Sequence, residues 1–441
     1  MSQTQTNIGS KNTGDSLTAS EFNTLNDTLN LNSADAESRL VSTQTNNSNL
    51  ASRITTIEGT SVPILSYTIE NLPETAETGT VAYNTTDQVI VYHKNGNWYK
   101  ISDNTIVLVD FTFNVKTDNA GTSTSTQFTL PLVSGNTYAF DIDWGDGNSE
   151  TISSDVQVTH TYATAGTYTI VINGVVQGFK FDNGGDKDKL IEILNFGNLT
   201  FDSDASDAFY GCSNLTISAS NGPDTSSATN FFWFYNGCTA LTSIPLMDTS
   251  NGTNMFGIFT NCQNVTTLPD FDFGSATSIR DSFSRMYSLT TLDNIQNLSG
   301  TTDMRSTFLS CRSLTSVPNI DTSATTSMWD TFRDLQTITT FPQLNTSNVT
   351  SFKGTWWGNV NQVSFPLLDM SSGNDFTDAF RACAFDSTAI DNIMQALVAN
   401  GSSNLTTNIS GGTNLPYASW SAQAQADHAT LISRGWTITT N

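Results

Sequence analysis

A repeated motif in the second half of the sequence constrains the fold more than any other feature. Segments such as 234–245 and 308–318 share an aromatic residue, a cysteine and a Leu-Thr-Ser-hydrophobic-Pro ending. One column of the motif has successive spacings of 26, 24, 24, 25, 24, 25 and 23 residues, and its members are Cys212, Cys238, Cys262, Met286, Cys311, Leu335, Val360 and Cys383. A unit of this length cannot bury an apolar face alone, so we expect neighbouring units to stack.

Two further columns indicate the local structure of each unit. An aromatic column contains Phe209, Phe234, Phe259, Phe283, Phe308, Phe332, Trp356 or Trp357, and Phe380. A third column contains Met255, Ile279, Met304, Met328, Phe352 and Phe376. The hydrophobic-x-x-x-Phe-x-x-Cys spacing is helical, whereas Leu-Thr-Ser-Ile-Pro alternates like a short strand that proline ends. We therefore expect one or two helical turns and one strand in each unit.

All of the cysteines, five in number, lie in the first column. Methionine, leucine and valine fill the same column in other units, which indicates a need for an apolar side chain rather than for a thiol. A disulfide between neighbouring units is sterically feasible, but free buried thiols are the favoured interpretation. A zinc site is disfavoured because no histidine lies within the repeats.

Residues from about Asp207 to Asp386 resemble the BspA-type leucine-rich repeats of bacterial and phage surface proteins. The resemblance rests on Phe-x-x-Cys-x-x-Leu-Thr-Ser-hydrophobic-Pro and on Asp-Thr-Ser turns at 248–250 and 321–323. It implies an α/β solenoid of leucine-rich-repeat type over 201–388, used for adhesion or recognition. Residues 389–441, with an amphipathic helix at 390–398 and two tryptophans, Trp420 and Trp436, are expected to cap its last apolar layer.

Short alternating strands separated by turn residues precede the repeats and predict a small β-sandwich over 104–200. Trp144-Gly-Asp-Gly147, followed by His160-Thr-Tyr162 and Ala165-Gly-Thr-Tyr168, is similar to the PKD-type immunoglobulin-like domain. Asp143 and Asp146 have oxygen ligands suited to calcium, but a turn capped by its own aspartates is the simpler interpretation. His160 has no cysteine or histidine near it in the sequence, so we expect it to form a structural hydrogen bond.

The N-terminal part carries two weaker patterns. In residues 61–103, two strand-like runs are joined by Asn95-Gly96, which predicts a β-hairpin and resembles hairpins of phage tail and fibre proteins. Residues 22–60 predict a coiled-coil stalk. The apolar members of its heptad seam are Phe22, Leu25, Leu29, Leu40, Leu50, Ile54 and Ile57. A trimer is favoured over a dimer from resemblance to fibre stalks, and a polar, partly disordered tether is the alternative. Residues 1–21 are then expected to dock onto other virion proteins.

Charge and composition restrict the partners. The chain has 17 basic and 41 acidic residues and a formal net charge of −24, so nucleic acid is a poor partner. The N-terminal residues show no secretory signal, and no run is long and apolar enough for membrane insertion. The three histidines lie in different modules, and no catalytic, metal or cofactor motif is recognisable. We therefore expect neither an enzyme nor a bound cofactor.

One series of residues in the repeats is a candidate receptor-binding stripe. Its members are Phe231, Phe256, Arg280, Arg305, Trp329 and Lys353. Four arginines, Arg285, Arg312, Arg333 and Arg381, lie on the same stretches of the repeats. Aromatic rings and guanidinium groups side by side suit sugar rings and acidic glycans. The alternative interpretation is that these cations pair with Asp281, Asp303, Asp330 and Asp378 while the aromatic rings pack on their neighbours.

Together these patterns predict a modular, mainly β protein: the structural fibre of a bacteriophage virion, on tail or head. It would be made in the host cytoplasm, assembled as a homo-oligomer, and would recognise a glycan or protein of the host surface. The alternative is a bacterial cell-surface adhesin with the same repeats. Both functions are assigned by analogy of repeats and fold.

Overall fold

The protein is represented by a computed structural model that describes residues 110–441 apart from 293–294 and 318–319. It also describes the backbone of four short strands between residues 65 and 100. The chain divides into two compact units, Met1–Val109 and Asp110–Asn441. The expected docking segment (1–21) and the heptad seam (22–60) lie outside the described residues.

The first unit contains a four-stranded sheet in the order β1-β2-β3-β4. Its strands are β1 (Leu65–Tyr67), β2 (Val81–Asn84), β3 (Val89–Lys94) and β4 (Asn97–Lys100). Strands β3 and β4 are antiparallel, and Lys94 pairs with Asn97 across the connection of residues 95 and 96. The hairpin expected at Asn95-Gly96 is therefore present. The sequence did not predict β1, which pairs with β2 in parallel.

The second unit begins with a sandwich-like arrangement of β-strands, as expected. These strands are β5 (Phe111–Lys116), β6 (Gln127–Thr129), β7 (Tyr138–Asp143), β8 (Ser149–Ile152), β9 (Thr159–Thr161) and β10 (Thr167–Gln177). Three later strands, β11 (Leu190–Asn195), β12 (Leu199–Thr200) and β13 (Thr216–Ile217), complete a seven-stranded sheet. Its order is β13-β11-β5-β10-β7-β8, with β12 paired to β10, and β6 and β9 form a separate pair. Alternate residues are buried along β5 and β7, because successive side chains of a strand point to opposite faces.

The large sheet continues directly into the repeats. Its members β11 and β12 are followed by β13, which pairs with β11 in parallel. Thr200 then bridges to Asp224 in the next coil of the chain. The first coils of the repeats therefore pair with strands of this sheet.

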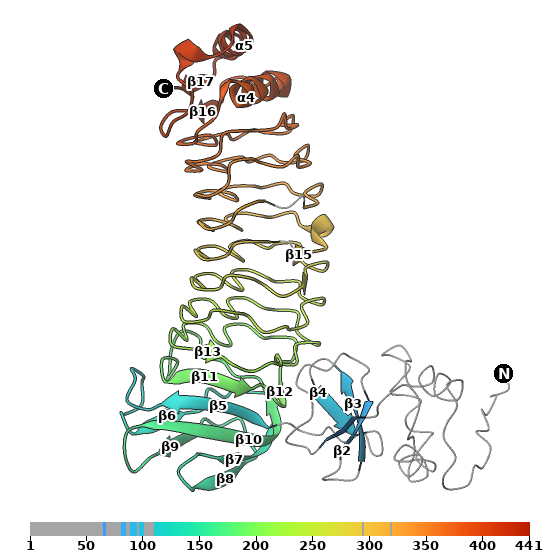
Figure 1. The fold of residues 1–441 in the computed structure, drawn as a ribbon, viewed down its shortest axis with the longest axis vertical. Helices are drawn as coiled ribbons and strands as arrows, with labels where there is room; N and C mark the ends of the chain where they lie inside the picture. The colour runs from blue at the N-terminus through green and yellow to red at the C-terminus, as the bar shows by residue number, and fades with distance from the viewer. Residues whose placement is uncertain are drawn as a thin grey trace, which may run out of the picture. The chain divides into compact units, whose positions relative to one another are not determined.

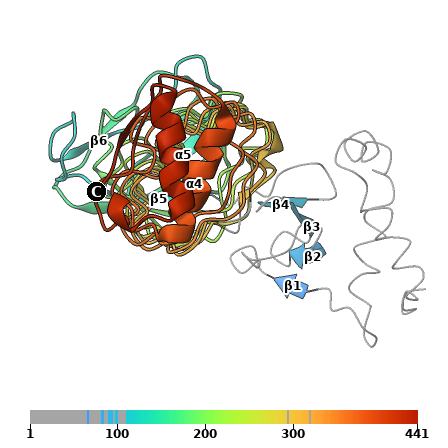
Figure 2. The same cartoon turned by 90° about the horizontal axis from the view of Figure 1, so that it is seen from above.

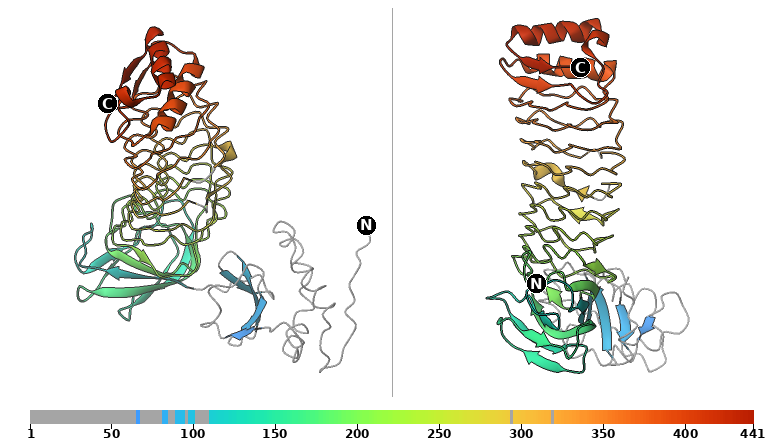
Figure 3. Two further views of the ribbon diagram at one scale, coloured as in Figure 1. Left: turned by 45° about the horizontal axis from the view of Figure 1, so that its top comes forward. Right: turned by 90° about the vertical axis from the view of Figure 1, so that its left-hand side faces the viewer.

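From about residue 201 to residue 386 the chain forms a stack of coils (Figure 1; Figure 3). Parallel bridges join neighbouring coils at Asp204, Asn230, Asn254, Ser278, Asp303, Ser327, Ser351 and Asp375. Amide groups of one coil donate to carbonyl groups of the next, as Phe209 N does to Phe234 O at 2.8 Å. Strands β14 (Phe271–Asp272) and β15 (Ile295–Gln296) and the 3₁₀ helix η2 (Leu298–Gly300) are local elements of the stack. Stacking therefore satisfies backbone groups that no local helix satisfies.

The prediction of one or two helical turns in each repeat is wrong. Within the described part of 201–386 there is no α-helix. Single turns occur instead, such as Ser282 N to Ile279 O (3.1 Å) and Met286 N to Phe283 O (3.3 Å). Asp281 and Arg285 have φ of 57° and 59°, and a right-handed helix cannot continue through left-handed residues. Their amide groups donate to the next coil, as Asp281 N does to Arg305 O at 3.0 Å.

Left-handed residues recur in two columns of the stack. The first contains Asp207, Trp233, Gly257, Asp281, Ser306, Asp330, Gly354 and Asp378, and the second contains Gly211, Gly237, Asn261, Arg285, Ser310, Asp334, Gly358 and Ala382. Each pair turns the chain at one edge of its coil, where the outer side chains lie. The backbone at this edge is therefore the same in every repeat although the side chains differ.

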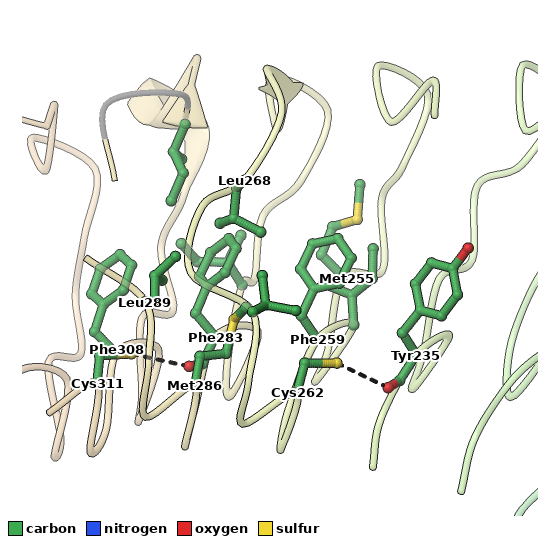
Figure 4. Close-up of a cluster of buried hydrophobic side chains, with 14 of the residues drawn as sticks. Tyr235, Met255, Phe259, Cys262, Leu268, Phe283, Met286, Leu289, Phe308 and Cys311 are labelled. Carbon is green, nitrogen blue, oxygen red and sulfur yellow. Dashed lines mark hydrogen bonds between the residues drawn. The ribbon is translucent and has the colours of Figure 1, made fainter. Parts of the chain in front are cut away.

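Aromatic and sulfur-containing side chains fill the interior of the stack (Figure 4). The rings of Phe283 and Phe308, and those of Phe308 and Phe332, lie 5.6 Å apart and are stacked. One predicted core member is one residue out of register. Asn359, not Val360, is buried, and its Oδ1 accepts from Leu335 N at 2.8 Å. Trp356 is the fully buried member of the tryptophan pair.

The expectation of free buried thiols is confirmed. All of the cysteines are unpaired and buried. The Sγ of Cys262 donates to Tyr235 O at 3.2 Å, and Cys311 Sγ donates to Phe283 O at 3.1 Å (Figure 4). Burial raises the pKa of the Cys311 thiol to about 12, so this group remains a neutral hydrogen-bond donor.

The end of the stack is covered by helices α4 (Ser387–Asn400) and α5 (Ala422–Ser433), shown in red across the coils in Figure 2. Strands β16 (Thr406–Asn408) and β17 (Thr437–Thr439) and the 3₁₀ helix η3 (Tyr417–Ser419) complete this region. Asp386 caps α4 by accepting from Ala389 N at 2.8 Å. The amphipathic helix expected at 390–398 is therefore confirmed. Within the described residues, no helix combines the length and apolarity needed to cross a bilayer.

Candidate functional site

From Asn230 to Ser351, the residue two positions after each bridged residue forms what we call the outer column of the coil stack. Its members are Phe232, Phe256, Arg280, Arg305, Trp329 and Lys353. Bridged strands lie roughly 4.8 Å apart, so successive members are close neighbours. The structure thus brings together five of the six residues of the expected stripe. It corrects the sixth: Phe231 is fully buried, and Phe232 takes its place in the column.

Aromatic side chains gather at the start of the outer column. The rings of Phe232 and Phe256 are stacked with centroids 5.2 Å apart. Trp233 lies 4.5 Å from Phe232 and 4.9 Å from Tyr210. The guanidinium carbon of Arg280 lies 5.2 Å from the Phe256 ring centroid. All of these side chains are partly exposed, so they form an apolar surface that ends in a cation.

Ion pairs fix the arginines of the outer column. Arg305 Nε and Nη2 donate to Asp303 Oδ1 and Oδ2 at 2.9 and 2.7 Å. Arg280 Nε lies 3.3 Å from Asp281 Oδ2. The Arg280 and Arg305 side chains remain 41% and 36% exposed. A bidentate pair of this kind orients the guanidinium plane while leaving its outer surface available to a ligand.

The alternative interpretation expects the repeat arginines to pair with nearby aspartates, and such pairs are present. Arg333 pairs with Asp330 at 3.4 Å and Arg381 with Asp378 at 3.7 Å. Burial raises the pKa of Asp330, and the neighbouring Arg333 offsets only part of that effect. Exposed pairs contribute only about 0–1 kcal/mol each to stability. Pairing therefore accounts for the orientation of the cations better than for their presence along one edge.

Trp329 and Lys353 end the outer column. The Lys353 Nζ lies 4.6 Å from the Trp329 ring centroid. Trp329 is 40% exposed, although it is among the largest apolar side chains of the protein. A cation over an exposed indole forms a flat amphipathic surface of the kind that binds sugar rings.

The turn at Asp143 and Asp146 uses its own carboxylates. Asp143 Oδ1 accepts from Gly145 N at 2.8 Å, and Asp146 Oδ1 accepts from Asn148 N at 3.0 Å. His160 Nε2 lies 2.9 Å from Asp146 Oδ2. Burial alone would raise the pKa of Asp146, but the hydrogen bonds from His160 and Asn148 hold it below its ordinary value. This geometry matches the capped turn and the structural histidine expected from the sequence.

The described residues contain no group of three or more metal-ligating side chains. His428 lies in the cap, with ring centroids 4.9 Å from Tyr417 and 5.9 Å from Trp420. Burial lowers its pKa. Trp420 and Trp436 are almost fully buried, and Trp436 lies 5.6 Å from Phe376 of the last coil. These aromatic side chains close the core of the stack rather than form a surface.

Two parts of the chain match families of known proteins. Residues 107–174 match the model of the PKD domain. Residues 203–319 match the model described as "Mycoplasma protein of unknown function, DUF285". No curated protein and no solved structure matches the chain. The first match supports the resemblance carried by Trp144-Gly-Asp-Gly147, and the second begins where the coil stack begins. The chain is therefore similar to PKD domains in its β-sandwich and to a family of uncharacterised Mycoplasma proteins in its repeats.

Proposed function

We propose that this protein is the structural fibre of a bacteriophage virion, on tail or head, and that its repeats recognise the host cell surface. The coil stack is then a solenoid of leucine-rich-repeat type that presents one edge to the receptor. The observation that carries the proposal is the outer column. In a chain with a net charge of −24, arginine, lysine and aromatic side chains are concentrated in one exposed row.

The geometry of the outer column supports a binding role. The backbone carbonyl group of each member accepts a hydrogen bond from an amide group of the preceding coil, as Arg305 O does from Asp281 N at 3.0 Å. Ion pairs orient Arg280 and Arg305 before any ligand arrives. Side chains that are ordered in advance lose less conformational entropy on binding. Rings of sugars stack on aromatic side chains, while guanidinium groups bind carboxylates and sulfates of acidic glycans. The receptor is accordingly a glycan or protein of the host surface.

The virion assignment draws on the N-terminal patterns. The heptads of residues 22–60 support a trimeric coiled-coil stalk, and residues 1–21 are proposed to dock onto other virion proteins. The protein is then located in the virion. The proposal includes no reaction, no cofactor, no nucleic acid and no insertion into a membrane.

A bacterial cell-surface adhesin is the second candidate function. The match of residues 203–319 to a family named for Mycoplasma proteins favours it. Both candidates use the same binding edge and differ in where the protein is found. Immunogold labelling with antibody against residues 110–441 separates them, because the fibre labels purified virions and the adhesin labels bacterial cells.

The proposed binding edge is tested with the purified full-length chain and intact cells of candidate hosts. We expect the wild type to bind and a triple variant, Arg280→Ala, Arg305→Ala and Trp329→Ala, to lose most of that binding. A matched control carries Thr267→Ala, Ser316→Ala and Thr340→Ala, three exposed positions elsewhere on the coils. Circular dichroism and thermal unfolding establish that both variants fold. Equal binding by the triple variant and the wild type would falsify the proposal.

The oligomeric state is tested independently by light scattering of the full-length chain. A mass of three chains supports the stalk of residues 22–60. A monomeric mass contradicts the stalk and leaves the binding edge to be judged by the cell-binding assay alone.

A further inference from the structure

A shallow groove lies beside the outer column, across four successive coils. It has a volume of about 440 Å³ and is lined by Arg285, Leu309, Ser310, Arg312, Arg333, Asp334, Trp357 and Gly358. Its three arginines lie on the same stretches of the repeats as the expected stripe. The groove itself was not predicted, because the residue spacing leaves open which tryptophan of the pair 356–357 belongs to the core.

The groove concentrates positive charge. Three guanidinium groups and a single carboxylate, that of Asp334, line it. Arg312 Nη2 and Nε lie 2.8 and 2.9 Å from Asp334 Oδ2. The Ser310 hydroxyl donates to the same oxygen at 3.0 Å. The carboxylate of Asp334 is therefore already engaged, which leaves the other arginines without it.

Arg285 is the arginine of the groove that forms no close ion pair, although its charge acts to lower the pKa of Asp281. Its side chain is exposed and makes no ion pair with any residue that the structure describes. Its backbone has φ of 59°, a conformation that favours glycine or asparagine and disfavours arginine. The equivalent positions of neighbouring coils are Asn261 and Ser310. The fold thus places in the lining of the groove a guanidinium group that forms no close ion pair with a described residue, at a position where a smaller residue fits better.

Trp357 provides the apolar wall of the groove. The guanidinium carbon of Arg333 lies 3.6 Å from its ring centroid, and that of Arg381 lies 4.7 Å from it. Arg333 and Arg381 belong to the coils before and after that of Trp357, so cations from both neighbouring coils hold the indole. An indole beside fixed guanidinium groups accepts the apolar face of a sugar ring while the cations bind its acidic substituent.

We propose that this groove binds an acidic polysaccharide, with Arg285 and Arg333 bonded to carboxylate groups and a sugar ring stacked on Trp357. A polymer fits better than a single anion because the cations Arg285, Arg312 and Arg333 come from three successive coils. This inference rests on the proposed function, since it names the chemical class of the surface component recognised. It adds a second contact surface for that component, beside the outer column.

The decisive variant is Arg285→Gly in the full-length chain. Glycine removes the guanidinium group and accepts the left-handed backbone without strain, so the variant is expected to unfold at a temperature equal to or above that of the wild type. Its affinity for oligogalacturonate, measured by calorimetry, should fall at least about fivefold, because a charged hydrogen bond is lost. A merely structural arginine would not produce a loss of binding together with unchanged or increased stability.

Controls define what the result means. Lys116→Gln removes one positive charge from β5 and should leave oligogalacturonate affinity unchanged, and uncharged maltohexaose should not bind. Unchanged affinity in Arg285→Gly, an equal loss in Lys116→Gln, or equal binding of maltohexaose overturns the groove proposal. So does inorganic sulfate that binds as tightly as the oligosaccharide and shows the same loss in Arg285→Gly. Failure of the proposed function is recognised separately, by intact cell binding in the outer-column triple variant.

Discussion

The thiol of Cys311 donates a hydrogen bond to the carbonyl oxygen of Phe283, one coil earlier, over 3.1 Å. The same bond joins Cys238 to Phe209 at 3.1 Å and Cys383 to Trp356 at 3.0 Å. A buried carbonyl oxygen has two lone pairs, and Phe283 O already accepts from Met286 N. The thiol occupies the second lone pair and fills the core at the same time.

Replacing Cys311 with alanine should therefore destabilise the stack. The substitution removes a fully buried side chain and its hydrogen bond, so we expect the free energy of unfolding to fall by about 1–2 kcal/mol. Urea unfolding followed by circular dichroism measures the change. Ser316→Ala, an exposed position of the same coil, should change stability by less than about 0.5 kcal/mol. A loss no larger than that of Ser316→Ala would contradict this role of the thiol.

The residues that fill the core were largely predictable from the sequence. Met255, Phe283 and Cys311 were assigned to three apolar columns, and all are fully buried. Columns of this kind are visible because the stack demands an apolar side chain at the same place in every coil. The hairpin at residues 95 and 96 and the helix ending at Gly401 likewise have local signals, a turn dipeptide and a left-handed C-terminal glycine.

The path of the backbone was not predictable in the same way. Apolar residues spaced four and three apart fit a helix, and they fit equally two turns separated by left-handed residues. Gly257 and Asn261 are a local sign of the second arrangement. Trp233 and Arg285 adopt the same φ without that sign, because hydrogen bonds to neighbouring coils hold them there. Backbone hydrogen bonds between coils do not depend on the type of side chain, so they cannot be predicted from the residue pattern.

The candidate site shows a similar division. The row of cations and aromatic rings was visible in the sequence, because it recurs at the repeat period. The one-residue error at Phe231 arose where phenylalanines are adjacent, so that pattern alone cannot say which of Phe231 and Phe232 points inward. The stacking of Arg333 on Trp357 at 3.6 Å depends on how two coils are aligned and could not be derived from spacing.

Two glycines of the same turn in the β-sandwich should differ in their tolerance of alanine. Gly145 and Gly147 have φ of 77° and 89°, so both substitutions place alanine in a strained backbone. A Cβ on Gly145 would lie 2.3 Å from the Thr169 carbonyl oxygen, whereas one on Gly147 meets no atom within 4 Å. We expect Gly147→Ala to cost about 1 kcal/mol and Gly145→Ala at least about 2 kcal/mol more.

Thermal unfolding of the two alanine variants measures this difference directly. Each variant is the control for the other, because they share the unfavourable φ and differ in the clash. Equal melting temperatures would show that backbone strain alone decides the outcome.

A buried lysine, just before β11, holds together a polar network inside the β-sandwich. Lys189 is fully buried, and its Nζ lies 3.8 Å from Asp186 Oδ1. The Nζ also donates to Ser123 Oγ (2.7 Å) and to the carbonyl oxygens of Ser123 (3.1 Å), Thr124 (2.7 Å) and Gln127 (2.9 Å). Burial lowers the pKa of Lys189, and Asp186 offsets part of this effect.

Lys189→Met should leave several buried carbonyl oxygens without their donor and the buried Asp186 carboxylate without its counter-charge. We expect a loss of about 3–5 kcal/mol in the free energy of unfolding. Lys116→Met, where the Lys116 side chain is 45% exposed and pairs with Asp118 at 3.4 Å, should have a small effect. Denaturant unfolding compares the two variants, and similar losses in both would argue against the buried network.

Asp303 should make the stability of the outer column depend on pH. Burial alone would raise the pKa of Asp303, but hydrogen bonds from Arg305 more than offset it and hold the pKa below its ordinary value. A carboxylate with a lowered pKa in the folded state contributes stability above its unfolded pKa, about 3.9. That contribution is lost as pH falls through the folded pKa.

We therefore expect Asp303→Asn to unfold at a lower temperature than the wild type at pH 7, by the equivalent of about 0.5–1 kcal/mol. The difference should shrink as pH falls below about 4. In an Arg305→Gln background the same substitution removes no ion pair, so its pH-dependent part should disappear. Melting temperatures of the four chains between pH 3 and pH 7 test both statements. A difference that persists at pH 3, or in the Arg305→Gln background, would assign the effect of Asp303 to its hydrogen bond with the backbone amide of residue 305 instead of to the ion pair.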